Sequence, residues 1–176
     1  MFTAPARYTG SMSAASKPAA KPRTRILAID YGRRRIGLAI ADTEAGLAEP
    51  LATLDRVNRN ADMRRLRELA REHGVKRILV GLPLRLDGTR GEMAEEAERF
   101  AGRVRKQIGL PVELADERLS SWEAERKMEE EFGRRLGGRS RNRSGEKISV
   151  DSVAAVVILR DFLVKTAASQ PPQEDI

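Results

Sequence analysis

Residues 26–40 read ILAIDYGRRRIGLAI, and this stretch decides the fold. Two short apolar runs, 26–29 and 36–40, flank a polar turn that contains Gly32. Runs of this length and composition are typical of buried β-strands. Strands joined by so short a connection pair in antiparallel fashion. The stretch therefore predicts an antiparallel hairpin at the start of the folded domain.

Asp30 stands at the end of the first of these strands. A carboxylate at the end of an apolar strand is unfavourable unless a partner stabilises its charge, so Asp30 is a candidate functional residue. The alternative is a turn cap, because aspartate before Tyr-Gly is common turn chemistry. The hairpin alone does not separate these two interpretations.

The composition limits the chemistry that the chain can perform. Its 176 residues suffice for one domain with a sizeable core. The absence of cysteine excludes disulfides, cysteine–zinc sites and a cysteine nucleophile, and fits a reducing compartment such as the cytoplasm. With His73 as the single histidine, metal chemistry must use Asp and Glu, which favours Mg²⁺ or Mn²⁺. No apolar run approaches the length that spans a membrane.

The net charge of +7 is concentrated in two places. Residues 1–24 hold four basic residues and no acid, and residues 133–147 hold six basic residues and one acid. Localised basic segments suit a polyanionic partner such as nucleic acid. The alternative is a solvated loop that binds no particular partner.

The composition also sets the expected domain boundaries. We expect a disordered basic tail over residues 1–24 and a disordered tail over 167–176. Between them, one domain spans 25–166 and includes a mobile basic loop at 133–149. The first tail also fits an organelle transit peptide, and Met12 is an alternative start of the chain.

Strand and helix patterns alternate after the hairpin. Pro50 marks its strand as an edge strand. The periodicity predicts further strands over 47–54, 76–81 and 111–115, and helices over 62–73, 92–108, 120–132 and 150–164. This order predicts an α/β fold with a mixed five-stranded sheet, three antiparallel strands followed by two parallel ones, and helices on both faces.

Acidic residues follow or open the elements that meet at one end of such a sheet. Asp30 ends the first strand, Asp116 and Glu117 follow the last strand, and Asp151 opens the last helix. Sites of α/β sheets form at the carboxyl ends of the strands. A few carboxylates there can hold two divalent ions, which clamp the attacking water and the leaving oxygen of a phosphodiester. The alternatives are a helix-dipole role for Asp151 and a solvated strand end for the other pair.

Basic residues would frame this acidic site with positive charge. Such an arrangement suits a metal-dependent nuclease, because cations bind the backbone phosphates on either side of the scissile bond. The candidate nucleic-acid-binding residues are Arg33, Arg34, Arg35, Arg118, Arg139, Arg141 and Arg143.

Four sequence blocks together resemble the YqgF family, also called RuvX, of ribonuclease H-like proteins. The resemblance covers about residues 25–165. Any one block is weak, but four in order at matching spacing are specific. The blocks are AIDYG at 28–32 with RIG at 35–37 and AD at 41–42, VGLP at 80–83 with DGT at 87–89, DERLSS at 116–121, and VDSVAA at 150–155 with IL at 158–159.

The resemblance implies a ribonuclease H-like fold and a metal-dependent nuclease of 5′-end maturation of pre-16S ribosomal RNA. Its motif positions make Asp30, Glu117 and Asp151 the metal carboxylates, and place Lys147 near the scissile phosphate. Glu117 is preferred to Asp116 because adjacent residues of a strand point in opposite directions, and because the family pattern favours the glutamate. One departure is the serine pair at 120–121, where the family usually has threonines.

Two other functions remain open from the sequence, and a third is disfavoured. A Holliday junction resolvase would act on branched DNA as a dimer, whereas a ribosomal RNA nuclease would act as a monomer or a homodimer. A non-catalytic RNA- or ribosome-binding factor would bind RNA without Asp30. A phosphotransferase of the actin and sugar-kinase type is disfavoured, because it needs two domains and this chain has room for one.

Overall fold

The computed structural model describes residues 24–117, 127, 130–131, 134, 141–142 and 145–168. The predicted helix over 120–132 lies largely outside these residues. The elements in chain order are β1 (Arg25–Tyr31), β2 (Arg35–Asp42), β3 (Leu47–Asp55), α1 (Arg59–Glu72), β4 (Val75–Leu82), α2 (Glu92–Ile108), β5 (Val112–Asp116) and α4 (Val150–Ala168).

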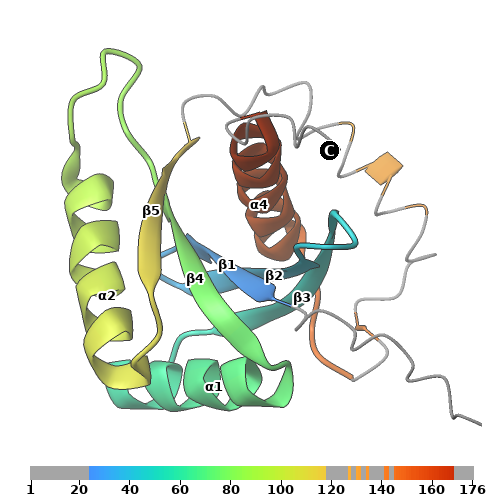
Figure 1. The fold of residues 1–176 in the computed structure, drawn as a ribbon. Helices are drawn as coiled ribbons and strands as arrows, with labels where there is room; N and C mark the ends of the chain where they lie inside the picture. Colours follow the sequence, from blue (N-terminus) through green and yellow to red (C-terminus); the bar gives the residue numbers. More distant parts are fainter. Residues whose placement is uncertain are drawn as a thin grey trace, which may run out of the picture.

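The five strands form one mixed sheet in the order β3-β2-β1-β4-β5 (Figure 1). The pairs β1–β2 and β2–β3 are antiparallel, whereas β1–β4 and β4–β5 are parallel. This topology confirms the predicted sheet of three antiparallel strands followed by two parallel ones. Pro50 lies in β3, an edge strand, and the β2–β3 register shifts beside its partner Ala39, as expected where a proline interrupts the ladder.

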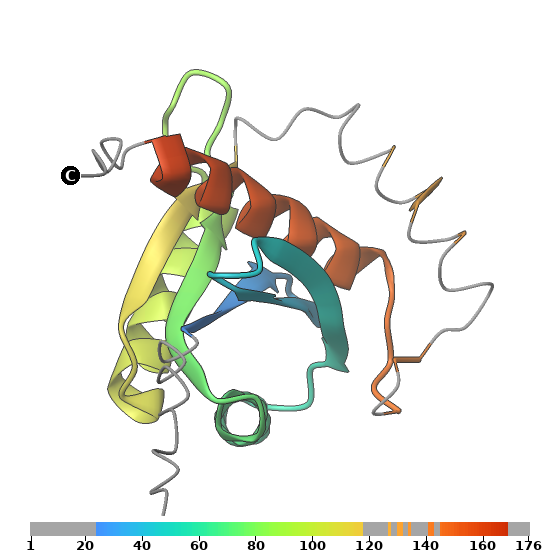
Figure 2. The same ribbon diagram turned by 45° about the vertical axis from the view of Figure 1, so that its right-hand side comes forward.

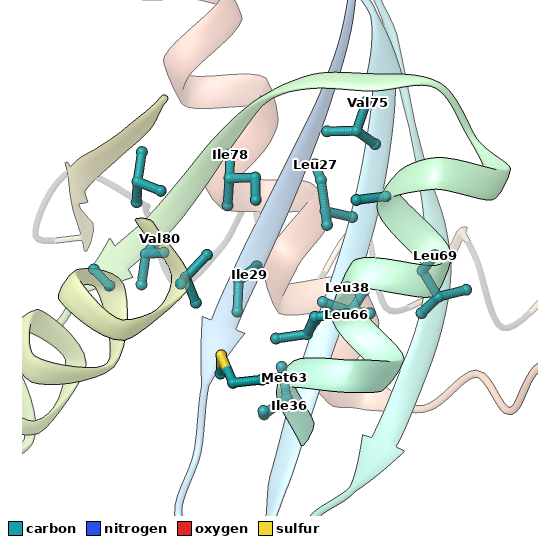
Figure 3. Packing of buried hydrophobic residues seen from close by; sticks show 14 of the residues in the cluster. Leu27, Ile29, Ile36, Leu38, Met63, Leu66, Leu69, Val75, Ile78 and Val80 are labelled. Atoms are coloured by element: carbon teal, nitrogen blue, oxygen red, sulfur yellow. The ribbon is translucent and has the colours of Figure 1, made fainter. Parts of the chain in front are cut away.

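Helices cover both faces of the sheet. α4 crosses one face and packs on β1, β2 and β3, while α1 and α2 lie on the other face (Figures 1 and 2). Successive β1 residues alternate between the two layers. Leu27 and Ile29 join the core under α1 and α2 (Figure 3), whereas Ile26 and Ala28 pack with α4. The same alternation directs Asp30 to the α4 face, at the carboxyl end of β1.

Capping residues fix the start of α1 and the end of α2. The Asn58 side chain accepts a hydrogen bond from the backbone N–H of Ala61 at 2.9 Å and caps α1. Gly109, with φ of 78°, ends α2 in the left-handed conformation that glycine favours. Among the described residues, none of the helices combines the length and the apolar character needed to cross a lipid bilayer.

Part of the predicted basic loop is fixed to the edge of the sheet. The backbone N–H of Thr53 in β3 donates to the Lys147 carbonyl at 2.6 Å, and the Asn142 amide donates to the Leu51 carbonyl at 2.7 Å. Arg65 of α1 also forms an ion pair with Glu146. Residues 141–142 and 145–149 of the loop are therefore anchored on β3. Arg134, also within the predicted loop, is helical, and its Nε donates to the Glu130 carbonyl at 3.2 Å, while the other loop residues lie outside the described part of the chain.

Candidate functional site

Asp30 lies in a row with two glycines across the three central strands. Its Cα partner on β2 is Gly37. On β4, the partner of Ile29 is Val80, so the next residue, Gly81, lies beside Asp30. Residues in such a row point to the same face of a sheet, here the face covered by α4. The two glycines leave space on either side of the Asp30 carboxylate.

The start of α4 occupies the space above Gly37. A Cβ atom added to Gly37 would overlap the backbone carbonyl of Asp151 and lie 2.9 Å from the backbone nitrogen of Ser152. Ser152 is fully buried at this contact. The missing side chain of Gly37 thus allows the backbone of Asp151 to lie one strand away from Asp30.

The carboxylate of Glu117 occupies the space above Gly81. A Cβ atom added to Gly81 would overlap Oε1 of Glu117 and lie 2.8 Å from Cδ1 of Ile158 in α4. Asp116, the preceding residue, pairs with Leu82, which packs against α2 on the opposite face. The alternation along β5 therefore favours Glu117 over Asp116 as the acid that joins Asp30.

Two polar side chains hold the carboxylate of Asp151. The Arg35 Nε lies 3.1 Å from Oδ2 of Asp151, and the Ser149 hydroxyl donates to the same oxygen at 2.8 Å. Ser149 is tied in turn to Thr53, a buried residue of β3, through a hydroxyl–hydroxyl distance of 3.0 Å. The carboxylate of Asp151 thus has a defined orientation, in which it pairs with Arg35, the first residue of β2.

The carboxylates of Asp30, Glu117 and Asp151 are the type of ligand that a hard divalent ion takes. In this structure they approach one another without converging on a single point. Carboxylate oxygens are the ligands that Mg²⁺ and Mn²⁺ prefer, and the two glycines form the cradle in which these acids approach one another. Within the described part of the chain, however, no group of three or more Asp, Glu or His residues is arranged to hold an ion. Asp151 would have to exchange Arg35 for the ion.

A pocket opens beside Glu117, between β5 and the second half of α4. Its lining includes Ala115, Glu117, Asp161, Phe162 and Lys165. Burial raises the pKa of Asp161 above its ordinary value, and the nearby Lys165 partly opposes that shift. This pocket gives the α4 side of Glu117 access to solvent.

Several predicted nucleic-acid-binding cations pair with acids of the protein. Arg33 forms ion pairs with Glu96 at 2.7 Å and with Glu92 at 2.8 Å, and its hydrogen bond to Glu96 raises the pKa of the guanidinium most. The Lys147 Nζ lies 2.9 Å from Asp55.

Two of the other predicted cations, Arg34 and Arg141, lie within the described residues. Arg34 is exposed, and the Arg141 guanidinium donates to the Gly145 carbonyl at 2.6 Å. Arg118, Arg139 and Arg143 lie outside the described residues.

A partly buried network that sequence reasoning missed fixes the turn after Asp30. Arg56 donates to Asp62 at 2.9 Å, to the Tyr31 hydroxyl at 3.0 Å and to the Gly32 carbonyl at 3.1 Å. Burial alone would lower the pKa of Arg56, but its hydrogen bonds to Asp62 and Tyr31 raise it overall. The sole sequence signal was Asp62 in the first turn of a helix, which resembles an ordinary helix-dipole charge.

Comparison with known proteins identifies the family. The model of a family described as "RuvX: Holliday junction resolvase" matches residues 24–165. The chain belongs to the RuvX family. The resemblance seen in the four sequence blocks is thereby confirmed.

Curated relatives cover nearly the same part of the chain. A protein of Anaeromyxobacter dehalogenans is 43% identical over 143 residues, which are 81% of this chain and 98% of the relative. A protein of Chloroflexus aurantiacus is 41% identical over 138 residues, covering 78% of this chain and 85% of the relative. Both relatives are named "Putative pre-16S rRNA nuclease". The family description and these names both support the predicted nuclease class.

The fold also matches a solved structure. RuvC of T. thermophilus, in complex with a Holliday junction substrate, superimposes with a TM-score of 0.56. The two chains are 15% identical, and the match covers 83% of this RuvX-family chain and 98% of RuvC. At this identity the match bears on the fold, and it confirms the predicted ribonuclease H-like architecture.

Proposed function

We propose that this protein is a divalent-metal-dependent endonuclease that processes the 5′ end of pre-16S ribosomal RNA in the cytoplasm, where ribosomes are assembled. The observation that carries the proposal is the row of Asp30 between Gly37 and Gly81, with Glu117 over one glycine and Asp151 over the other. The names of the curated relatives support the RNA substrate.

Each acid of the proposed site has a distinct support. Asp30 is placed by β1, Glu117 by the end of β5, and Asp151 by the first turn of α4. Mg²⁺ or Mn²⁺, when bound by these carboxylates, supplies charge stabilisation at the scissile phosphate and an activated water. Ser149 keeps Oδ2 of Asp151 oriented by donating its hydroxyl hydrogen.

Cations around the acids would bind the phosphates on either side. Arg34 is exposed, and Arg35 lies at the rim beside Asp151. Arg33 and Lys147 are held by Glu96 and Asp55, so phosphate binding requires that they exchange partners. Such contacts position a backbone without reading its sequence.

A Holliday junction resolvase is the second candidate, because the family model carries that description. Cleavage of two labelled substrates in Mn²⁺, a pre-16S leader RNA and a four-way DNA junction, distinguishes the two. We expect the RNA to be cut at one position near its mature 5′ end while the junction stays intact. Symmetric cutting of the junction alone would favour the resolvase, and RNA binding without any cleavage would favour a non-catalytic binding factor.

Arg35 is expected to compete with metal ions for Asp151. Replacing Arg35 by glutamine removes the guanidinium from Oδ2 of Asp151, so we expect Mn²⁺ to bind about fivefold more tightly, the scale of one exposed ion pair. Isothermal titration calorimetry of Mn²⁺ binding measures this change without cleavage. Arg34→Gln is the matched control, because it removes the same charge from the neighbouring exposed residue. Weaker Mn²⁺ binding by Arg35→Gln than by the control would mean that Arg35 supports the site.

A further inference from the structure

The connection between β4 and α2 is an ordered hairpin that projects beyond the sheet and the helices (Figures 1 and 2). Leu84 and Arg90 form an antiparallel bridge, and the Arg85 N–H donates to the Thr89 carbonyl at 3.0 Å. At the turn, Asp87 accepts hydrogen bonds from the hydroxyl and the N–H of Thr89 at 2.7 and 2.9 Å. These bonds also lower the pKa of Asp87, and they fix the shape of the tip.

The tip of this hairpin presents a leucine to solvent. Leu86 is 96% exposed, the largest exposure among the large apolar residues of the described chain. Single exposed apolar residues are common on protein surfaces. Leu86 differs from such residues because the hydrogen bonds at the turn already hold its backbone. Inserting its side chain into a partner would therefore cost little backbone entropy.

The hairpin begins at the proposed site. Leu82, the last residue of β4 before the hairpin, directly follows Gly81, above which the Glu117 carboxylate lies. Four residues of fully extended chain would reach about 13 Å from Leu82. The Leu84 N–H donates to the Leu82 carbonyl at 2.9 Å and bends this arm, so Leu86 lies closer to Leu82 than that. Nucleotides in a stacked strand are spaced by about 3.4 Å, so the tip lies within about four nucleotides of a phosphate bound at the end of β4.

The charges of the hairpin suit a nucleic-acid strand. Arg85 and Arg90 lie on its two arms, and Asp87 is the acid between them. The carboxylate of Asp87 is engaged by Thr89, and Arg90 forms an ion pair with Glu98 of α2 at 3.1 Å. An apolar tip flanked by cations is the arrangement of wedges that enter between bases while cations bind the backbone.

We propose that the β4–α2 hairpin is a nucleic-acid contact in which Leu86 inserts between bases within about four nucleotides of the cleaved bond. The inference rests on the proposed nuclease function. It adds to that function a contact, at the hairpin tip, that separates two stacked bases of the substrate. It favours substrates whose stacking is already weakened, such as unpaired ends and branch points, because less stacking is lost when the leucine enters.

The test uses the full chain with Ca²⁺ in place of Mg²⁺, so that binding is followed without cleavage. The probes are the leader RNA and the four-way DNA junction, each with 2-aminopurine replacing adenines within about four nucleotides of the mature 5′ end or the branch point. Fluorescence of 2-aminopurine rises when the base is unstacked. Leu86→Ala is compared with Leu47→Ala, because Leu47 is 65% exposed and pairs with Asp42 at the opposite end of the sheet.

We expect the wild type and Leu47→Ala to raise the fluorescence, whereas Leu86→Ala does not and binds about tenfold more weakly, as loss of a buried leucine contact predicts. Wild-type fluorescence and affinity in Leu86→Ala would overturn the inference. Absence of any fluorescence rise with wild type, or a change in oligomeric state as the sole effect of Leu86→Ala, would also overturn it.

Cleavage of unlabelled substrates in Mn²⁺ separates this inference from the proposed function. If wild type cuts and Leu86→Ala matches it in cleavage, affinity and fluorescence, the hairpin inference alone fails. If wild type cuts neither substrate but the fluorescence rise still depends on Leu86, the nuclease function fails and the contact remains.

Discussion

Replacing Asp30 by asparagine is expected to lower the cleavage rate about 10³-fold and to leave the fold unchanged. The substitution keeps the size of a side chain that lies between Gly37 and Gly81, but it removes the charge that would hold an ion. Losing about 4 kcal/mol of the stabilisation that such ions give a transition state corresponds to about 10³-fold in rate. Initial rates on the labelled leader RNA in Mn²⁺, with circular dichroism for the fold, measure both effects.

Asp42→Asn is the matched control for this substitution. Asp42 ends β2 at the opposite end of the sheet, where its carboxylate accepts a hydrogen bond from the N–H of Glu44 at 3.0 Å. An asparagine can accept the same bond, so we expect a normal cleavage rate. If Asp30→Asn also cleaves normally, the chemistry does not depend on the acid between the two glycines.

Alanine at Gly37 is expected to destabilise the protein by about 3 kcal/mol, the upper part of the range for overpacking. The added Cβ meets the backbone of Asp151 and Ser152, which cannot move unless α4 shifts on the sheet. Guanidinium unfolding followed by circular dichroism measures the change in the free energy of unfolding. Gly102→Ala in α2 is the control, since nothing lies within 4 Å of its added Cβ, and we expect it to stabilise the helix by about 0.5–1 kcal/mol.

Alanine at Gly81 is expected to act differently, because there the Cβ meets side chains. The carboxylate of Glu117 and the end of Ile158 can rotate away, so the loss of stability is smaller than for Gly37→Ala, while cleavage falls steeply as Glu117 leaves its place. Equal losses of stability in the two variants, with normal cleavage by Gly81→Ala, would contradict the packing described above.

Local patterns in the sequence were sufficient to predict most of the fold. The antiparallel hairpin predicted for residues 26–40 is confirmed by β1 and β2, and Pro50 correctly marked an edge strand. The helix over 120–132 and the first part of the loop, 133–140, remain predictions, because they fall almost wholly outside the described residues. The proposed metal ligands likewise remain predictions, although their placement agrees with the choice of Glu117 over Asp116.

The pairing of charges was not predictable from local patterns. Arg33 with Glu96, Arg56 with Tyr31, and Lys147 with Asp55 join residues that lie 25 to 92 positions apart. Arg33 and Lys147 looked like free phosphate ligands in the sequence because their partners belong to other elements. In the same way, Gly37 and Gly81 appeared as motif letters, and the close approach of Asp151 and Glu117 became visible when the layers were assembled.

The ion pair between Arg35 and Asp151 has a thermodynamic consequence for how ligands would enter the site. An ion that takes Asp151 releases Arg35 for a phosphate, and a phosphate that takes Arg35 releases Asp151 for an ion. Each ligand therefore removes the competitor of the other, and by linkage the two affinities rise by the same factor. Metal and nucleic acid would bind this protein cooperatively, so that a complete catalytic centre assembles chiefly on the substrate.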